Sequence, residues 1–263
     1  MYAKKSLGQH FLRSEKALQT IIDAGDPTAD DIVLEIGPGE GVLTERLLEF
    51  AGKVVAVEKD DELSSKLEEK FKDKIGEGKL DLIHGDIVDF DPNALSLYKD
   101  LTYKLVANIP YNITGLIFRK FLSASYQPEL MVLLVQKEVA ERIVARDKKE
   151  SILSISIKAY GNPKYVETVK AGSFTPSPNV DSAILLVENI SKNFFKHFPE
   201  QEFFIMLRAG FASKRKKLSS NLSIVYPKQR VEDAFIALDL DPNTRAEDVH
   251  AETWQKLGNL LMR

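Results

Sequence analysis

The chain has 263 residues, of which 44% are apolar and 29% are charged, and its formal net charge is −3. This balance is typical of a folded protein with a buried core and excludes a disordered or membrane-embedded chain. The absence of cysteine excludes disulfide bonds, thiolate catalysis and cysteine-bound metal, and the four histidines show no metal-ligand spacing. Because the N-terminus also lacks the apolar stretch of a secretory signal, we expect a cytoplasmic protein that needs no metal.

The length predicts one α/β domain with a small appendage, since 263 residues exceed a single domain of ~150 residues but do not make two large ones. We place the boundary near residue 190, which gives domains at 1–190 and 191–263. The second part carries 12 Lys and Arg against 9 Asp and Glu, so its charge is +3, whereas the charge of the first part is −6. The negative total argues mildly against a nucleic-acid partner, and the distribution makes the C-terminal part the better surface for one.

Apolar runs alternate with helical patterns through the first part of the chain. The runs predict strands at residues 31–36, 53–57, 80–84, 103–107 and 130–135. Helical stretches follow them to about residue 50, at 60–74, at 113–124 and to about residue 145. Alternation of this kind predicts a mostly parallel sheet with helices on both faces.

The pattern changes from about residue 164. Two further strands, at 165–169 and 183–187, bring the predicted sheet to seven strands, and a proline-rich loop joins these two. After residue 190 only helical patterns remain, at 200–212, 230–238 and 252–261. The predicted fold is therefore a seven-stranded α/β domain followed by a small all-helical domain.

A glycine-rich motif lies where the first predicted strand turns into a helix. The sequence EIGPGEG at 35–41 has the spacing Gly-x-Gly-x-Gly, and Val42 stands where a dinucleotide-binding motif has its third glycine. Glycines at such a turn allow the backbone to approach a ligand, and ligands of parallel sheets bind beyond the carboxyl ends of the strands. With its acidic Glu35, the pattern resembles the first motif of S-adenosylmethionine methyltransferases, whose cofactor is cationic and has no pyrophosphate.

Two acidic residues complete the predicted cofactor site. Glu58 ends the second strand, 21 residues after Gly37, at a place where a carboxylate can accept ribose hydroxyls. Asp86 follows the third strand and could accept a hydrogen bond from the adenine amino group. The alternative is three unrelated turns in a protein without a nucleotide ligand, but all three features fall at the carboxyl ends of strands.

The fourth strand ends in the sequence NIPY at residues 108–111. The N6 amine of adenine is a poor nucleophile because its lone pair is delocalised into the ring. The side-chain carbonyl of Asn108 and a backbone carbonyl nearby could accept both N–H bonds and free that lone pair, which favours the transition state without metal or a strong base. Pro110 donates no backbone hydrogen bond, and Tyr111 can stack on the base. The alternative is a proline turn that merely closes a strand.

The loop FTPSP at 174–178 offers a second aromatic ring on a stiff turn. Enzymes that modify a base take it out of the stack. Phe174 could cover the other face of such a base, at about 1–3 kcal/mol per contact. The alternative is that Phe174 is a core residue.

Blocks at residues 7–12, 35–41, 108–111 and 174–183 are similar to the small-subunit rRNA adenine dimethyltransferases, the KsgA/RsmA/Dim family. Stretches at 136–142, 211–218 and 245–249 are similar too, so the resemblance covers nearly the whole chain. It implies a Rossmann-like methyltransferase domain, S-adenosylmethionine as the cofactor, and an immature small ribosomal subunit as the partner of a monomer. The implied reaction adds two methyl groups to N6 of each of two adjacent adenosines near the 3′ end of small-subunit rRNA.

The resemblance also assigns residues. It implies that Asn108, Tyr111 and Phe174 grip the adenine, with Pro110 in the same motif. The cofactor contacts that we expect are Gln9, His10, Leu12, Glu35, Gly37, Gly39, Gly41, Glu58, Lys59, Asp86, Ile87 and Asn108. His10 stands where many members have Asn, and Lys158 stands where we would expect Gln.

A compact basic run predicts the RNA surface. The predicted phosphate contacts are Arg208, Lys214, Arg215, Lys216 and Lys217. Contacts of this kind position RNA without reading its sequence, and the alternative is a solvated helix face. Weaker candidates are Lys4, Lys5, Arg146, Lys148 and Lys149.

Three other functions remain open at this point. A large-subunit rRNA methyltransferase of the antibiotic-resistance type shares the NIPY site, although the sequence VDSA at 180–183 and the block from Arg245 look more like the small-subunit enzymes. A non-enzymatic assembly factor would have no use for intact Asn108, Tyr111 and Phe174. A nicotinamide dehydrogenase is disfavoured by Val42 and by the lack of an obvious acid for hydride transfer.

Overall fold

The computed structural model describes residues 9–97 and 102–262. Lys4 and Lys5, and the first two residues of the block at 7–12, lie outside the described residues. The chain forms two compact units, one of residues 1–140 and 164–190 and the other of residues 141–163 and 191–263. The segment 141–163, which the predicted boundary at residue 190 assigns to the first domain, thus belongs to the second unit.

The first unit is built around a seven-stranded sheet in the order β4-β3-β2-β5-β6-β9-β7. Neighbouring strands from β4 to β6 are parallel, and β9 runs antiparallel to β6. The strands are β2 (Asp31–Ile36), β3 (Lys53–Glu58), β4 (Leu80–His84), β5 (Thr102–Asn108), β6 (Met131–Gln136), β7 (Asn162–Val169) and β9 (Ser182–Glu188). The predicted seven-stranded, mostly parallel sheet is confirmed.

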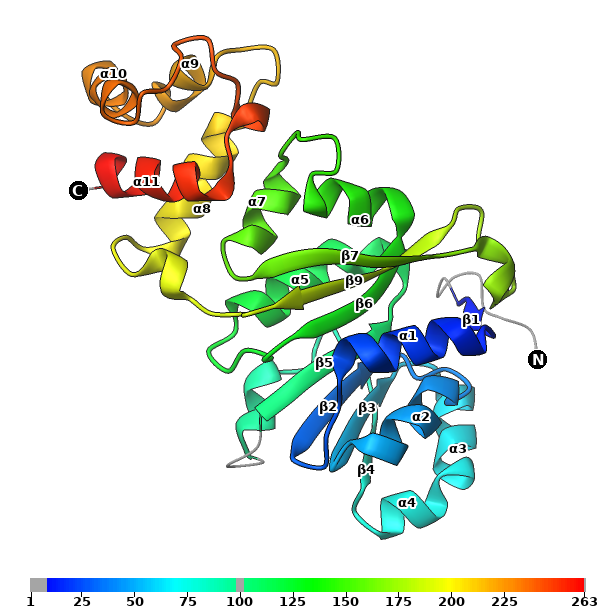
Figure 1. Ribbon diagram of the computed structural model, residues 1–263. Coiled ribbons are helices and arrows are strands. Elements are labelled where there is room, and N and C mark those ends of the chain that lie inside the picture. The colour runs from blue at the N-terminus through cyan, green and yellow to red at the C-terminus, as the bar shows by residue number, and fades with distance from the viewer. Residues whose placement is uncertain (1–8, 98–101, 263) are drawn as a thin grey trace. The chain divides into compact units, whose positions relative to one another are not determined.

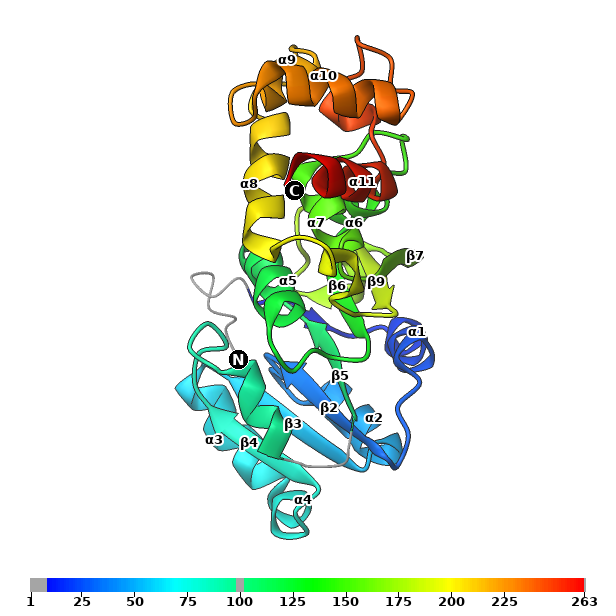
Figure 2. The same cartoon turned by 90° about the vertical axis from the view of Figure 1, so that its left-hand side faces the viewer.

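Helices cover both faces of this sheet. Figures 1 and 2 show α1 (Glu15–Gly25) and α2 (Val42–Phe50) on one face and α5 (Thr114–Ser123) on the other. The remaining helices of the unit are α3 (Asp61–Lys70) and α4 (Lys72–Gly76), with short 3₁₀ turns η2 (Pro92–Leu97), η3 (Tyr111–Ile113) and η4 (Ala171–Ser173). Because side chains alternate across a strand, Val33, Val106 and Val132 pack on the same face as Leu18 and Ile22 of α1.

A short second sheet ties the start of the described chain to the proline-rich loop. Strand β1 (Phe11–Leu12) pairs antiparallel with β8 (Phe174–Thr175), with Leu12 opposite Phe174. The backbone N–H of Arg13 continues the pairing by donating to Ser173, 2.8 Å away. These two strands and helix α1 were not among the predicted elements.

The second unit is helical. Helix α6 (Lys137–Val144) begins in the first unit and ends in the second. The other helical elements of the second unit are α7 (Ile152–Lys158), η5 (Asn193–Phe195), α8 (Glu200–Gly210), α9 (Leu218–Leu222), α10 (Lys228–Ala237), η6 (Ala246–Asp248) and α11 (Ala251–Leu261). The three helices predicted after residue 190 are confirmed as α8, α10 and α11. Ile155 of α7 is buried in the same core as Phe203 and Trp254, which explains why the earlier segment belongs here.

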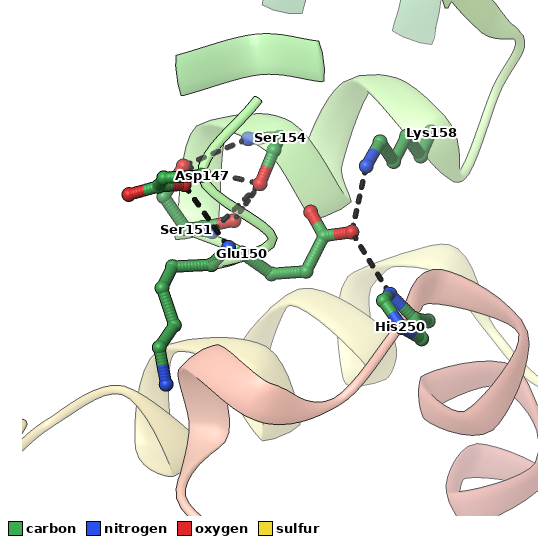
Figure 3. A network of polar contacts seen from close by, with 7 residues as sticks. Asp147, Glu150, Ser151, Ser154, Lys158 and His250 are labelled. Carbon is green, nitrogen blue, oxygen red and sulfur yellow. Dashed lines mark hydrogen bonds and ion pairs between the residues drawn. The ribbon is translucent and has the colours of Figure 1, made fainter. Parts of the chain in front are cut away.

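A buried carboxylate organises the polar contacts of this unit (Figure 3). The side chain of Glu150 is 1% exposed, and its Oε1 lies 2.6 Å from Lys158 Nζ and 3.4 Å from His250 Nδ1. The backbone N–H of Glu150 donates to Glu247, 2.7 Å away. Lys158, unexpected in the sequence, therefore serves as the main counter-charge of a buried acid.

No helix in the described ranges has both the length and the apolar character that crossing a bilayer requires.

Candidate cofactor and base-binding site

The predicted cofactor residues meet in one pocket at the carboxyl ends of β2, β3, β4 and β5. The pocket lies where the chain order reverses between β2 and β5, the usual ligand position in such sheets, and its volume is about 140 Å³. Of the residues predicted to touch the cofactor, its wall contains Gln9, His10, Leu12, Glu35, Gly37, Gly39, Glu58, Lys59, Asp86, Ile87 and Asn108. Pro110 and Tyr111 line the same pocket.

Gly41 is the exception, because it serves packing rather than the pocket wall. Its φ is +77°, and an added Cβ would lie 2.6 Å from Phe71 Cε2 and 2.8 Å from Leu67 Cδ2. Gly37, also in the left-handed region at φ +65°, has no atom within 4 Å of the position of an added Cβ. The first glycine therefore opens the wall of the pocket, while the third lets α3 pack against the turn.

Glu58 is a buried carboxylate held by the backbone. Its Oε2 accepts from the N–H of Gly39 at 3.0 Å, and its Oε1 accepts from the N–H of Asp60 at 2.9 Å. Each carboxylate oxygen still has a lone pair to offer. Glu58 is thus fixed in place and able to accept hydroxyl groups, as predicted for a ribose.

Asp86 and Lys59 form an ion pair at the wall of the pocket. Lys59 Nζ lies 2.6 Å from Asp86 Oδ2, and Asp86 Oδ1 accepts from the N–H of Val88 at 2.9 Å. The hydrogen bond from Lys59 holds the pKa of Asp86 below its ordinary value. Asp86 is therefore an ionised acceptor beside the apolar side chain of Ile87.

Glu35 lies deeper in the pocket wall and is 2% exposed. Its Oε2 accepts from the hydroxyl of Thr44 at 2.7 Å. Burial raises the pKa of Glu35 to about 8, and the nearby charge of Glu58 adds to the shift. The carboxyl group is thus an acid whose ionisation would be favoured by a cation in the pocket.

Asn108 is oriented by the N-terminal segment. Its Nδ2 donates to the backbone carbonyl of His10 at 3.0 Å, so its Oδ1 remains to accept from a ligand. The His10 ring stacks near Tyr111, with centroids 6.0 Å apart and planes 20° apart, and its Nδ1 donates to the carbonyl of Pro176 at 2.8 Å. The Tyr111 hydroxyl in turn lies 2.6 Å from Ser182 Oγ.

The structure does not place Phe174 in the pocket. Its side chain is 3% exposed and belongs to the hydrophobic core with Leu18 and Ile184, while its neighbour Thr175 is exposed. Successive residues of a strand point to opposite faces, and in β8 it is Phe174 that faces inward. The expectation that its ring covers one face of a base is not met in this conformation, and the core alternative describes its surroundings.

Sequence reasoning missed the residues that hold the site together. Thr44, Pro176 and Ser182 contact Glu35, His10 and Tyr111 respectively, across 9, 166 and 71 positions of the chain. Only Thr44 had a local signal, since it lies in the first turn of the helix that follows the glycines. Among the described residues, no group of three His, Asp or Glu side chains is arranged to hold a metal ion.

The basic run lies in an exposed loop of the second unit rather than on a helix. Residues 214–217 connect α8 to α9, and all four side chains are exposed, as is Arg208 of α8. Within the described ranges none of these five side chains has an ion-pair partner. The buried amide of Asn221 holds the loop by donating to the carbonyls of Gly210 at 2.6 Å and Ser213 at 3.0 Å.

Comparison with known proteins places this geometry in a family. The family model described as "Ribosomal RNA adenine dimethylase" matches residues 1–262. A protein of Dehalococcoides mccartyi named ribosomal RNA small subunit methyltransferase A is 44% identical over 257 residues, covering 97% of this chain and 87% of the relative. A protein of the same name from Nostoc sp. is 38% identical over 268 residues, covering 98% of this chain and 97% of the relative.

Two solved structures extend the similarity. A dimethyladenosine transferase from Plasmodium falciparum is 28% identical, with a TM-score of 0.79, and the match covers 94% of this chain and 96% of the other. The 23S rRNA methyltransferase ErmE is 27% identical, with a TM-score of 0.75, and the match covers 95% and 99%. The Rossmann-like methyltransferase fold expected from the sequence is confirmed, with a helical C-terminal region. The chain therefore belongs to the ribosomal RNA adenine dimethylase family and is an rRNA methyltransferase.

Proposed function

We propose that this protein uses S-adenosylmethionine to dimethylate N6 of two adjacent adenosines near the 3′ end of small-subunit rRNA. The observation that carries the proposal is the amide of Asn108 at the wall of the pocket. Its nitrogen donates to His10, and its oxygen accepts no hydrogen bond from the described residues. Tyr111 lines the same wall, so an adenine at this position would meet an acceptor and an aromatic ring together.

The residues of the pocket fit the cofactor. Gly37 leaves an open wall for an adenosyl group, Glu58 would accept its ribose hydroxyls, and Asp86 would accept from its adenine amine beside Ile87. Bound there, S-adenosylmethionine would supply an electrophilic methyl group on a sulfonium, with S-adenosylhomocysteine as the product. Burial favours the neutral form of the Glu35 carboxyl group, and a cation nearby would lower its pKa and favour the ionised form.

The chain's contribution to the transfer is to make the amine a better nucleophile. Asn108 Oδ1 and a backbone carbonyl nearby would accept the two N–H bonds of N6 and hold the nitrogen lone pair out of conjugation with the ring. Pro110 has no N–H to compete for the acceptors. Placed acceptors of this kind stabilise positive charge that develops on the nitrogen in the transition state.

The small subunit is favoured over the large one by the curated relatives. Those at 38% and 44% identity carry the small-subunit name, whereas ErmE, whose name specifies 23S rRNA, is 27% identical. We further propose that the first unit holds the catalytic domain and that the second unit, with residues 141–163 added to the predicted 191–263, is the RNA-recognition domain. The side chains that would contact phosphates are Arg208, Lys214, Arg215, Lys216 and Lys217. The protein would act in the cytoplasm as a monomer on an immature subunit.

The test is to incubate the protein and S-adenosylmethionine with undermethylated small subunits and, separately, with large-subunit rRNA. Mass spectrometry should then map dimethyladenosine to two adjacent positions in the small-subunit RNA alone. Methylation of the large-subunit RNA instead, or of neither RNA, would contradict the proposal.

A further inference from the structure

The Tyr111 hydroxyl makes a polar contact with Ser182, the first residue of β9, which is not among the predicted site residues. The Tyr111 phenol oxygen and the Ser182 hydroxyl oxygen are 2.6 Å apart, and Ser182 has no exposed surface. We propose that Ser182 is a positioning residue, which fixes the plane of the Tyr111 ring and through it the plane of the adenine that stacks on that ring. The proposal rests on the proposed function and concerns the same pocket.

Ser182 is a fixed point because the sheet and the adjoining loop both hold its backbone. It pairs with Gln136 in the antiparallel β6–β9 ladder. The carbonyl of its neighbour Asp181 accepts from the N–H of Lys137 at 3.0 Å. The Asp181 carboxylate accepts from the N–H of Ala171 at 3.0 Å and pairs with Lys170 at 2.9 Å. The hydroxyl thus projects from a rigid strand end, which is a better support than a free loop.

Tyr111 needs such a support because its backbone alone does not set its ring. The residue begins the 3₁₀ turn η3, where its carbonyl accepts from the Thr114 hydroxyl at 3.0 Å. The His10 imidazole lies near one face of the ring, with centroids 6.0 Å apart, and does not contact the phenol end through a hydrogen bond. The contact with Ser182 supports that end, so the ring is held at its face and at its tip.

The orientation of the base matters most for the second methyl group. After the first transfer, N6 carries one methyl and a single N–H, so only one acceptor contact remains to orient the amine. The stacking plane then becomes the main restraint on the approach of the nitrogen to the methyl donor. Since a displacement of about 1 Å can cost a factor of about 100 in rate, loss of the Ser182 contact should slow the second transfer more than the first.

The experiment compares Ser182→Ala, Tyr111→Phe and the double variant with the parent protein on undermethylated small subunits. Both single variants delete the same hydrogen bond, and Tyr111→Phe does so without opening a cavity at β9. Ser177→Ala is the matched control, since Ser177 donates its hydroxyl to the backbone carbonyl of Ala171 at 2.9 Å and does not line the pocket. The measurements are kcat, cofactor affinity by calorimetry, and the ratio of monomethyl- to dimethyladenosine at equal total methylation.

We expect each single variant to lower kcat about tenfold and to raise the monomethyl fraction, with cofactor affinity unchanged. The kcat of the double variant should be no lower than that of the less active single variant, because both substitutions remove one shared contact. A monomethyl fraction equal to that of the parent, or effects that multiply in the double variant, would overturn the proposal. The ratio does not depend on how much protein is folded, so it separates positioning from stability. If the parent protein methylates no adenosine, the proposed function is wrong, and the positioning proposal loses its premise.

Discussion

The side-chain amide nitrogen of Asn108 donates to the backbone carbonyl of His10, 3.0 Å away and 98 positions earlier in the chain. The N-terminal segment therefore decides which atom of the amide faces the pocket. Because the same residue also touches Tyr111 and Pro176, His10 connects the acceptor, the aromatic ring and the proline-rich loop.

Replacement of Asn108 should abolish most of the activity even when the cofactor is saturating. We expect Asn108→Ala to lower kcat about 100-fold, the size of effect seen when one preorganised polar contact to a transition state is removed. Single-turnover methylation measures this, with calorimetry reporting cofactor affinity. Asn112→Ala, at an exposed position four residues later, is the control. Full turnover by Asn108→Ala would rule out the acceptor mechanism.

The buried acid at Glu35 should make the stability of the ligand-free protein depend on pH. Its pKa is raised from an ordinary 4.5 to about 8, so between these values the folded state holds a proton that the unfolded state has lost. Its stabilising contribution is therefore complete at low pH and is lost as the pH rises toward about 8. Glu35→Gln removes the dependence.

The prediction is that the melting temperature of Glu35→Gln minus that of the parent grows from pH 5 to about pH 8 and then levels off. Thermal unfolding across this range measures the difference. Glu68→Gln, at an exposed position of α3, is the matched control. A flat profile for Glu35→Gln would show that the acid is already ionised in the empty pocket.

The exposed loop at residues 214–217 should contribute a salt-dependent part of RNA binding. Lys214→Glu with Lys216→Glu should weaken binding to small subunits and lower the slope of log affinity against log salt by roughly 2, about 1 for each lysine. A titration from about 50 to 200 mM salt measures that slope. The matched pair Lys228→Glu and Lys256→Glu, exposed elsewhere in the same unit, should leave it close to the parent value. Equal slopes for both pairs would remove this loop from the RNA surface.

Breaking the ion pair at Glu150 should destabilise the second unit. Lys158→Gln leaves a carboxylate whose side chain is 1% exposed with His250 as its remaining partner, and we expect a loss of about 3 kcal/mol in the free energy of unfolding. Adding Glu150→Gln should recover much of that loss, because the uncompensated charge is gone. The fluorescence of Trp254, the single tryptophan of the chain, reports the unfolding from inside this unit's core. A double variant less stable than Lys158→Gln would contradict this account.

The strands could be predicted because parallel strands covered on both faces are nearly continuous runs of apolar residues, as in β6. The same topology located the pocket residues. Gly37 and Asp86 follow strands and Glu58 ends one, and the carboxyl ends of these strands share one edge. Helix α1 was missed although its signal is present: Ser14 caps it, and Leu18, Ile21 and Ile22 form its buried stripe.

Other features could not be predicted from local sequence. The side of β8 that faces the core decides the position of Phe174, and a two-residue strand has too short a pattern to show it. The contact of Tyr111 with Ser182 depends on the register of β9 against β6, which no nearby residue encodes. Long-range pairing thus determines the supports of the site, whereas local pattern determines its principal groups.

The second unit is assembled from two stretches of chain separated by strands of the first, and Ile155 and Ala159 from the earlier stretch are part of its core. A chimera that exchanges only residues 191–263 with a relative would bring in helices shaped for a different α7. The transplantable piece consists of both stretches together, so a chimera intended to swap substrate recognition between family members has to exchange residues 141–163 as well.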